Sequence, residues 1–127
     1  MKPLILFLFL SSFASPAQSQ KDGQIFLTEA LSRIPGPANE RFSKEFDGKE
    51  ITAYLYIPKT RDDQKPHTRD ELYIIISGNG TFFNGKETLH FAPGDILVVP
   101  ALAEHRFDTF SPDFKTWAIF YGPEKKN

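Results

Sequence analysis

Alternating apolar and polar residues in the middle of the chain predict a series of short β-strands. In residues 51–57 every second residue, starting at Ile51, is aliphatic, and the residues between them are Thr52 and two tyrosines. A period of two is typical of a strand with one buried face. Residues 72–76 and 96–99 are apolar throughout, which predicts two strands buried on both faces.

Turn signals separate these segments and indicate the fold class. Asn79–Gly80 and Asn84–Gly85 suit the φ > 0 positions of tight hairpin turns. The spacing of strands and turns predicts about eight short strands, which is typical of a β-sandwich or barrel. We therefore expect an all-β fold with one short helix over residues 28–33, capped by Thr28.

The chain is expected to divide into three parts. Residues 1–20 combine a positive charge, an apolar run and a tail of small residues, which is the pattern of a secretory signal peptide. Cleavage is expected between Ala17 and Gln20, with residues 21–45 as an irregular segment packing on a β-barrel of residues 46–123. We therefore expect a secreted or periplasmic protein with no membrane segment after signal cleavage.

Charge and cysteine content exclude several classes of function. The formal net charge is −1 and the basic residues are not clustered, so nothing indicates a nucleic-acid partner. The chain contains no cysteine, which excludes thiol catalysis and thiolate metal sites. The charged run over residues 58–66 is interpreted as a solvated turn.

Two histidines and one glutamate are candidate ligands of a divalent metal ion. His67 lies four residues before Glu71, and His105 follows the second apolar run. On one continuous strand His67 and Glu71 would lie about 13 Å apart, so sharing an ion requires a bend over residues 68–70. His90 lacks a carboxylate at a matching position and is not assigned to the site. Two imidazoles and one carboxylate with open positions suit Fe, Mn or catalytic Zn.

The spacing of these residues resembles the motifs of the cupin family. The matching positions are His67, Glu71 and Gly78 in the first motif, and Gly94, Pro100 and His105 in the second. The resemblance extends over about residues 51–121 and implies a jelly-roll β-barrel, often as a homodimer. It does not imply one reaction, because a fold hosts many different sites.

The match is incomplete at three positions of the motifs. Lys65 stands where the cupin family has its first histidine, Leu102 stands where the second motif has glycine, and Thr109 stands where it has asparagine. The usual four ligands are thereby reduced to three, and the amide oxygen of Gln64 could serve as a weak fourth ligand. A Lys65 side chain pointing into the barrel would repel a cation, whereas one pointing to solvent would leave the three-ligand site intact.

Three functional hypotheses remain open. The first is a metal-dependent enzyme of the oxygenase or isomerase type acting on a small molecule. The second is a non-catalytic module that binds a small ligand, with or without metal, and in the third the polar cluster is purely structural. The residues expected to contact the substrate at the barrel mouth are Tyr54, Tyr73, Phe107 and Trp117.

Overall fold

The computed structural model describes residues 23–34 and 41–126. The predicted signal peptide and its cleavage site lie outside the described residues. The elements are α1 (Leu27–Arg33), β1 (Phe42–Asp47), β2 (Ile51–Tyr56), β3 (Asp70–Ser77), β4 (Gly80–Phe83), β5 (Thr88–Phe91), β6 (Ile96–Val99), β7 (Arg106–Phe110) and β8 (Lys115–Tyr121). No helix in the described part of the chain is both long and apolar enough to cross a membrane.

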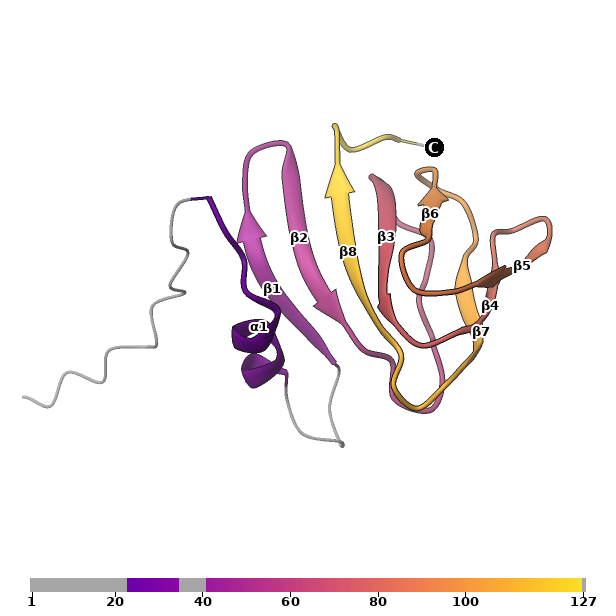
Figure 1. Cartoon of the computed structure of the whole chain (residues 1–127). Coiled ribbons are helices and arrows are strands. Elements are labelled where there is room, and N and C mark those ends of the chain that lie inside the picture. The colour runs from indigo at the N-terminus through magenta and orange to yellow at the C-terminus, as the bar shows by residue number, and fades with distance from the viewer. Residues whose placement is uncertain (1–22, 35–40, 127) are drawn as a thin grey trace, which may run out of the picture.

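Two antiparallel sheets form the molecule, as the alternating pattern and the turn spacing predict. The larger sheet has the strand order β1-β2-β8-β3-β6, and the smaller has the order β5-β4-β7. Figure 1 shows the larger sheet as a broad curved wall, with the smaller sheet beside its β3–β6 end. The predicted all-β jelly-roll barrel is confirmed.

The main core lies between the two sheets and is strongly aromatic. Its fully buried members include Tyr73 from the larger sheet and Phe82 and Phe107 from the smaller one. The rings of Phe82 and Phe107 lie 4.9 Å apart between centroids, and Phe107 lies 4.7 Å from Phe114. Burying such rings supplies most of the free energy that a chain without disulfides has for folding.

A second, smaller apolar cluster holds α1 against the outer face of the larger sheet. Ala30 and Leu31 of the helix pack there with Leu55 of β2 and Trp117 of β8. The predicted cap is wrong: the helix begins after Phe26, without a side-chain cap, and Thr28 lies inside the helix. A helix this short is stabilised by its packing rather than by its own hydrogen bonds.

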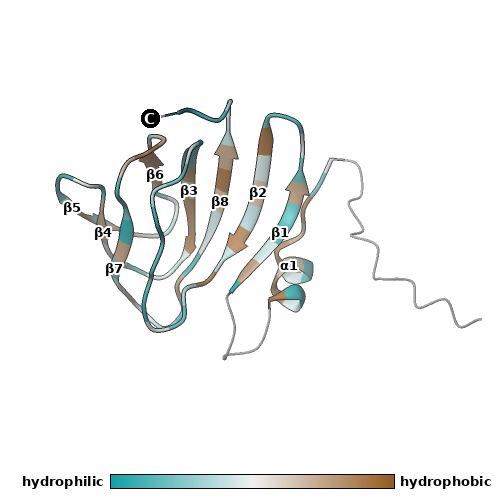
Figure 2. Ribbon diagram, turned by 180° about the vertical axis from the view of Figure 1, so that it is seen from behind, coloured by the Kyte–Doolittle hydropathy of each residue, from teal (hydrophilic) through white to brown (hydrophobic). Residues whose placement is uncertain are grey.

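Strand β6 differs from the sequence prediction, because only one of its faces is buried. Leu97 and Val99 face the core, but Ile96 and Val98 are each 58% exposed. β6 is the edge strand of its sheet and pairs with β3 alone. In Figure 2, β3 and β6 are both coloured as largely hydrophobic, although the outer face of β6 has no covering element among the described residues.

The charged loop of residues 58–66 is also not simply solvated. Asp62 is 5% exposed and accepts hydrogen bonds from the Tyr56 hydroxyl at 2.6 Å and from the backbone N–H of Phe107 at 2.8 Å. Tyr56 belongs to the larger sheet and Phe107 to the smaller one. The carboxylate therefore connects the two sheets through the loop.

Candidate metal centre

The predicted bend between His67 and Glu71 is present. Thr68 and Arg69 form the bend, and Glu71 is the second residue of β3. The guanidinium of Arg69 fixes the bend by donating to the carbonyl oxygens of Gly122, at 3.0 Å, and Glu50, at 2.7 Å. His67 is thereby turned back over the start of β3 instead of continuing along it.

The second histidine is brought to the same place by the turn after β6. The N–H of Leu102 donates to the carbonyl oxygen of His67 at 2.7 Å, which joins this turn to the bend. Leu102 has a φ of 71°, a left-handed conformation that favours glycine. The backbone thus keeps a glycine-like turn at the motif position where glycine is replaced. His105 follows this turn and is 1% exposed.

The three predicted ligands converge on one point. The Nε2 atom of His67 lies 2.7 Å from Oε2 of Glu71, and Nε2 of His105 lies 3.4 Å from the same oxygen. One ligand atom from each residue can be chosen so that all three lie within 4.8 Å of one another. Glu71 lies near the start of β3, opposite Val99 of β6 and Phe120 of β8.

Hydrogen bonds to the backbone orient both imidazoles toward this point. Nδ1 of His67 lies 2.8 Å from the carbonyl oxygen of Arg69, and Nδ1 of His105 lies 2.9 Å from that of Ala103. A carbonyl oxygen can only accept, so each Nδ1 carries a proton and donates it. In a neutral ring the Nε2 lone pair then faces the cluster, which is the arrangement that metal-binding histidines use.

The polar atoms at the centre of the cluster fit a cation. Oε1 of Glu71 and Nε2 of His105 are buried and have no hydrogen-bond partner among the described residues. Buried polar atoms are rarely left unpaired, because an unpaired group costs the full penalty of its desolvation. The lone pairs of His67 Nε2 and Glu71 Oε2 also face each other, which requires a shared proton or a cation beside them. The donor set, two nitrogens and a carboxylate, suits a divalent metal ion.

The electrostatics of the cluster favour a charged carboxylate. Burial alone would raise the pKa of Glu71, but its contacts with His105 and His67 outweigh burial and lower that pKa below its ordinary value. For His105 burial is the largest single influence and acts to lower the pKa, but the contacts with Glu71 and with the Ala103 carbonyl oxygen together outweigh it and raise that pKa above its ordinary value. Neither Arg69 nor Arg106 takes the place of the histidines: Arg69 binds the bend, and Arg106 pairs with Glu104 and Asp108.

The two residues around the lost histidine position have clear placements. Lys65 is exposed to solvent, so its ammonium group does not compete with a cation in the barrel. The amide oxygen of Gln64 accepts a hydrogen bond from the Tyr73 hydroxyl at 2.9 Å, and its amide nitrogen donates to Asp62 at 2.9 Å. Both polar groups of Gln64 therefore already have protein partners, and its role as a fourth ligand stays a prediction.

The four predicted substrate contacts are not brought together. Tyr73 and Phe107 are 0% and 1% exposed and belong to the aromatic core. Trp117 packs against the helix on the outer face of the larger sheet, so the structure separates it from the other three. Tyr54 lies on the inner face, half-buried, with Phe120 as an edge-on neighbour at 5.8 Å.

Two residues next to the site were not singled out from the sequence. Phe120 contacts the His67 ring at 4.8 Å between centroids. Nothing in the sequence indicated that Phe120 of β8 would lie beside His67, because this contact depends on the bend over residues 68–69. Asp62 is linked to the site through Gln64 and Tyr73. Its position in a charged loop gave no signal of burial.

Comparisons with known proteins agree with the fold and with the motif spacing. A family model for the cupin domain matches residues 54–113. An uncharacterized protein of Streptomyces coelicolor is 40% identical over 74 residues, which cover 58% of this chain and 70% of that protein. The chain belongs to the cupin superfamily.

Solved structures of cupins share the architecture at low sequence identity. A putative mannose-6-phosphate isomerase from Ralstonia eutropha superposes with a TM-score of 0.60 at 21% identity, covering 74% of this chain and 95% of that one. A cupin superfamily protein from Desulfitobacterium hafniense has a TM-score of 0.60 at 17% identity, with 79% and 93% covered. KdgF from a Halomonas species has a TM-score of 0.55 at 18% identity, with 66% and 81% covered. At these identities the likeness establishes the fold alone.

Proposed function

We propose that this cupin binds a divalent metal ion through His67, Glu71 and His105 and acts on a small molecule as an enzyme of the oxygenase or isomerase type. The observation that carries the proposal is the buried cluster itself, in which Glu71 Oε1 and His105 Nε2 have no hydrogen-bond partner in the part of the chain that the structure describes. The ion would be Fe, Mn or Zn. When bound, such an ion supplies a Lewis acid that polarises an oxygen-bearing substrate.

The chain's own residues would prepare the site in three ways. The carbonyl oxygens of Arg69 and Ala103 fix the ring orientations of the two histidines. The buried Glu71 carboxylate balances part of the positive charge of the ion. Phe120 and the aromatic core exclude water from one side of the cluster, which strengthens the electrostatic interactions within it.

Metal content after reconstitution tests the metal site. Wild-type protein is expected to hold close to one equivalent of metal by elemental analysis, whereas His105→Ala and the half-buried His67→Ala hold much less. His90→Ala is the matched control, because His90 is exposed on β5 and its loss should leave the metal content unchanged. Circular dichroism verifies that each variant is folded. Equal, substoichiometric metal in wild type and both site variants would overturn the proposal.

Acidification offers a second check on the same site. Metal binding requires neutral imidazoles, and the pKa of His105 is raised above its ordinary value, so the affinity should begin to fall before the pH has dropped to the ordinary histidine pKa of about 6.5. Retention of full metal content near pH 5, at limiting metal concentration, would count against the histidine ligands.

The alternative is a non-catalytic module that binds a small ligand. It is favoured by the full burial of Tyr73 and Phe107, which fill the barrel interior with protein side chains. The enzyme and the binding module are distinguished with a compound that stabilises the metal-loaded protein against heat. If wild type converts this compound and His105→Ala does not, the protein is an enzyme. If the compound is recovered unchanged from both proteins, the protein is a binding module.

Two further expectations belong to this proposal. Export rests on the leader-like residues 1–20 alone, and N-terminal sequencing of the mature protein from culture medium or periplasm tests it. The exposed apolar side chains of Ile96 and Val98 on β6 support the expectation of a homodimer.

A further inference from the structure

A cavity at the start of β1 stands apart from the metal ligands. It has a volume of about 340 Å³ and is lined by Arg41, Phe42, Tyr56, Pro58, Lys59, Arg61, Asp62, Asp63 and Gln64. None of the three candidate metal ligands is among these residues. The volume lies near the lower end of the range of roughly 300–1,000 Å³ for small-molecule sites, so the cavity suits a small ligand.

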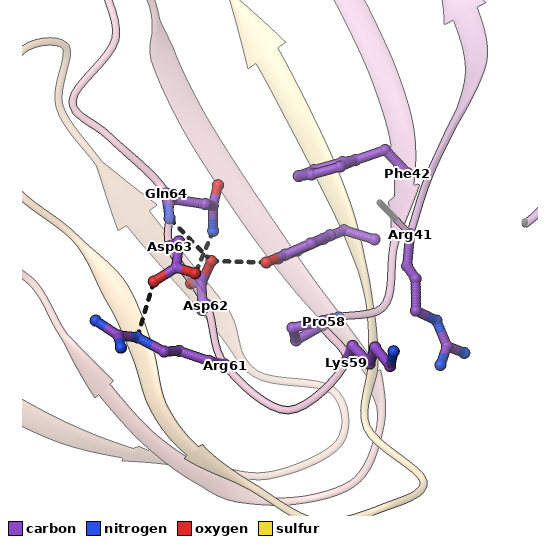
Figure 3. A pocket seen from close by; sticks show the side chains of 9 residues that line it. Arg41, Phe42, Pro58, Lys59, Arg61, Asp62, Asp63 and Gln64 are labelled. Carbon is purple, nitrogen blue, oxygen red and sulfur yellow. Dashed lines mark hydrogen bonds and ion pairs between the residues drawn. The ribbon is translucent and has the colours of Figure 1, made fainter. Parts of the chain in front are cut away.

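Two of the three basic residues of this cavity, Arg41 and Lys59, are not neutralised by its acidic residues, Asp62 and Asp63. Asp62 already accepts hydrogen bonds from Tyr56, Phe107 and Gln64, and Asp63 is paired with Arg61 at 2.8 Å. In Figure 3 the Arg41 side chain extends away from both aspartates, on the side of the cavity where Lys59 also lies.

Arg41 is the residue that most clearly needs a partner. Its Nε atom is buried and has no hydrogen-bond partner within the described ranges 23–34 and 41–126. A buried guanidinium N–H without an acceptor is costly. The carbonyl oxygen of Arg41 accepts from the N–H of Ile57 at 3.0 Å, which fixes the backbone from which the side chain reaches the cavity.

The wall next to Arg41 is apolar and flat. The Phe42 ring stacks on the Tyr56 ring at 4.1 Å with an interplanar angle of 9°. Pro58 also lines the cavity and is buried. This wall offers a surface for a planar apolar group but few hydrogen bonds, because the Tyr56 hydroxyl donates to Asp62.

We propose that this cavity binds a small organic monocarboxylate, with its carboxylate on Arg41 and Lys59 and its apolar body against Phe42 and Pro58. A carboxylate presents two oxygens that match the guanidinium fork. The cavity lining has three basic and two acidic residues, an excess of only one positive charge. A dianion such as phosphate would experience more repulsion from Asp62 and Asp63 than a monoanion. The proposal does not depend on the metal site.

Titration of metal-free protein with benzoate tests the proposal. Chelator-treated wild type is titrated by NMR, with the Arg41 Nε–H resonance and the amides of Phe42 and Lys59 as reporters, and by calorimetry. Benzyl alcohol has the same ring without the charge, and inorganic phosphate has charge without the ring. Benzoate is expected to shift the Arg41 Nε–H resonance and to bind about tenfold or more tightly than either probe. The absence of metal prevents benzoate from binding by coordination.

Two arginine variants sharpen the test. Arg41→Gln should lose at least about tenfold in benzoate affinity with unchanged circular dichroism, and Arg41→Lys should recover part of it. Arg106→Gln is the control, because Arg106 pairs with Glu104 and Asp108 outside the cavity, and should bind benzoate within about twofold of wild type. Equal affinity of wild type and Arg41→Gln, or equal binding of benzoate and benzyl alcohol, would overturn the proposal. Phosphate binding as tightly as benzoate would overturn the assignment to a monocarboxylate.

Discussion

At the scale of single residues, the backbone contacts of the polar side chains decide what the barrel interior can do. His67 and His105 both donate from Nδ1 to carbonyl oxygens two residues away in sequence. These short local contacts set which nitrogen faces Glu71. The sequence predicted the candidate ligands from their spacing, but ring orientation depends on the bend at Arg69 and the turn at Ala103.

Asp62 shows how a charged residue of a loop becomes structural. Its two carboxylate oxygens accept from a hydroxyl, a backbone N–H and an amide, so burying the charge is compensated by hydrogen bonds. Burial, together with the nearby negative charge of Asp62, raises the pKa of Tyr56 far above its ordinary value. The Tyr56 hydroxyl thus stays protonated and donates to Asp62 even at alkaline pH.

Tyr56→Phe should have an effect on stability that depends on pH. Near neutral pH the variant loses the hydrogen bond to a charged acceptor, and we expect it to be less stable by about 2 kcal/mol. Because the folded-state pKa is raised, the contribution of Tyr56 is fully present below the unfolded tyrosine pKa of about 10 and is lost as pH rises above it. The difference between wild type and Tyr56→Phe should therefore shrink by about 1.4 kcal/mol per pH unit above that value. Denaturant unfolding at neutral and alkaline pH measures it, and a constant difference would contradict the expectation.

At the scale of the elements, the glycines of the two motifs have different roles. Gly78, after β3, has a φ of 83°, and Gly94, before β6, has a φ of 88°. A Cβ atom on Gly78 would lie 2.6 Å from Cα of Phe114, whereas one on Gly94 would meet nothing within 4 Å. Gly94 is therefore needed only for its positive φ. Gly78 is needed for its positive φ and also because it allows the β7–β8 turn to approach β3 closely.

Replacing each glycine by alanine should separate these two demands. Gly94→Ala is expected to cost about 1 kcal/mol, the price of a left-handed alanine. Gly78→Ala should cost about 3 kcal/mol or more, because the backbone of Phe114 has to move and the Phe114 ring is fully packed in the core. Midpoints of denaturant unfolding give both values, with Gly94→Ala as the matched control for φ. Equal losses would show that the contact with Phe114 is soft.

The strands also show which features of the fold could be predicted from the sequence. The period of two predicted the strand β2, because alternation is a local property of a strand. It could not give the exposure of Ile96 and Val98, because whether an apolar strand is central or at an edge depends on the strand order. The sequence could not place Trp117 for a related reason. Both faces of β8 are apolar, and only the packing of α1 against one of them shows which face is the outer one.

At the scale of the whole molecule, the polar side chains of the candidate site lie inside the barrel, and an apolar patch lies on its outer surface. The candidate metal ligands Glu71 and His105 are buried between the sheets with Asp62, His67 is half-buried beside them, and the cavity at Arg41 opens beside β1. On the outer face, Ile96 is paired with Ile74 and Val98 with Leu72 across β3 and β6. The sequence predicted residues 72–76 and 96–99 as apolar strands buried on both faces. It did not predict that Ile96 and Val98 would be exposed to solvent.

The exposed apolar face of β6 leads to the prediction of a homodimer. Ile96 and Val98, each 58% exposed, adjoin the half-buried Leu72 and Ile74, and a contiguous apolar patch of this kind marks an interaction surface. A second copy of the chain can cover the patch through a two-fold axis, since such an interface uses the same surface twice. Wild type is therefore expected to sediment at twice the mass of one chain, and Val98→Lys to sediment as a monomer with its metal content retained. Thr88→Lys, on the exposed part of β5, is the control and should stay dimeric. A monomeric wild type at the highest soluble concentration, or a dimer unaffected by Val98→Lys, would show that β6 does not form the interface.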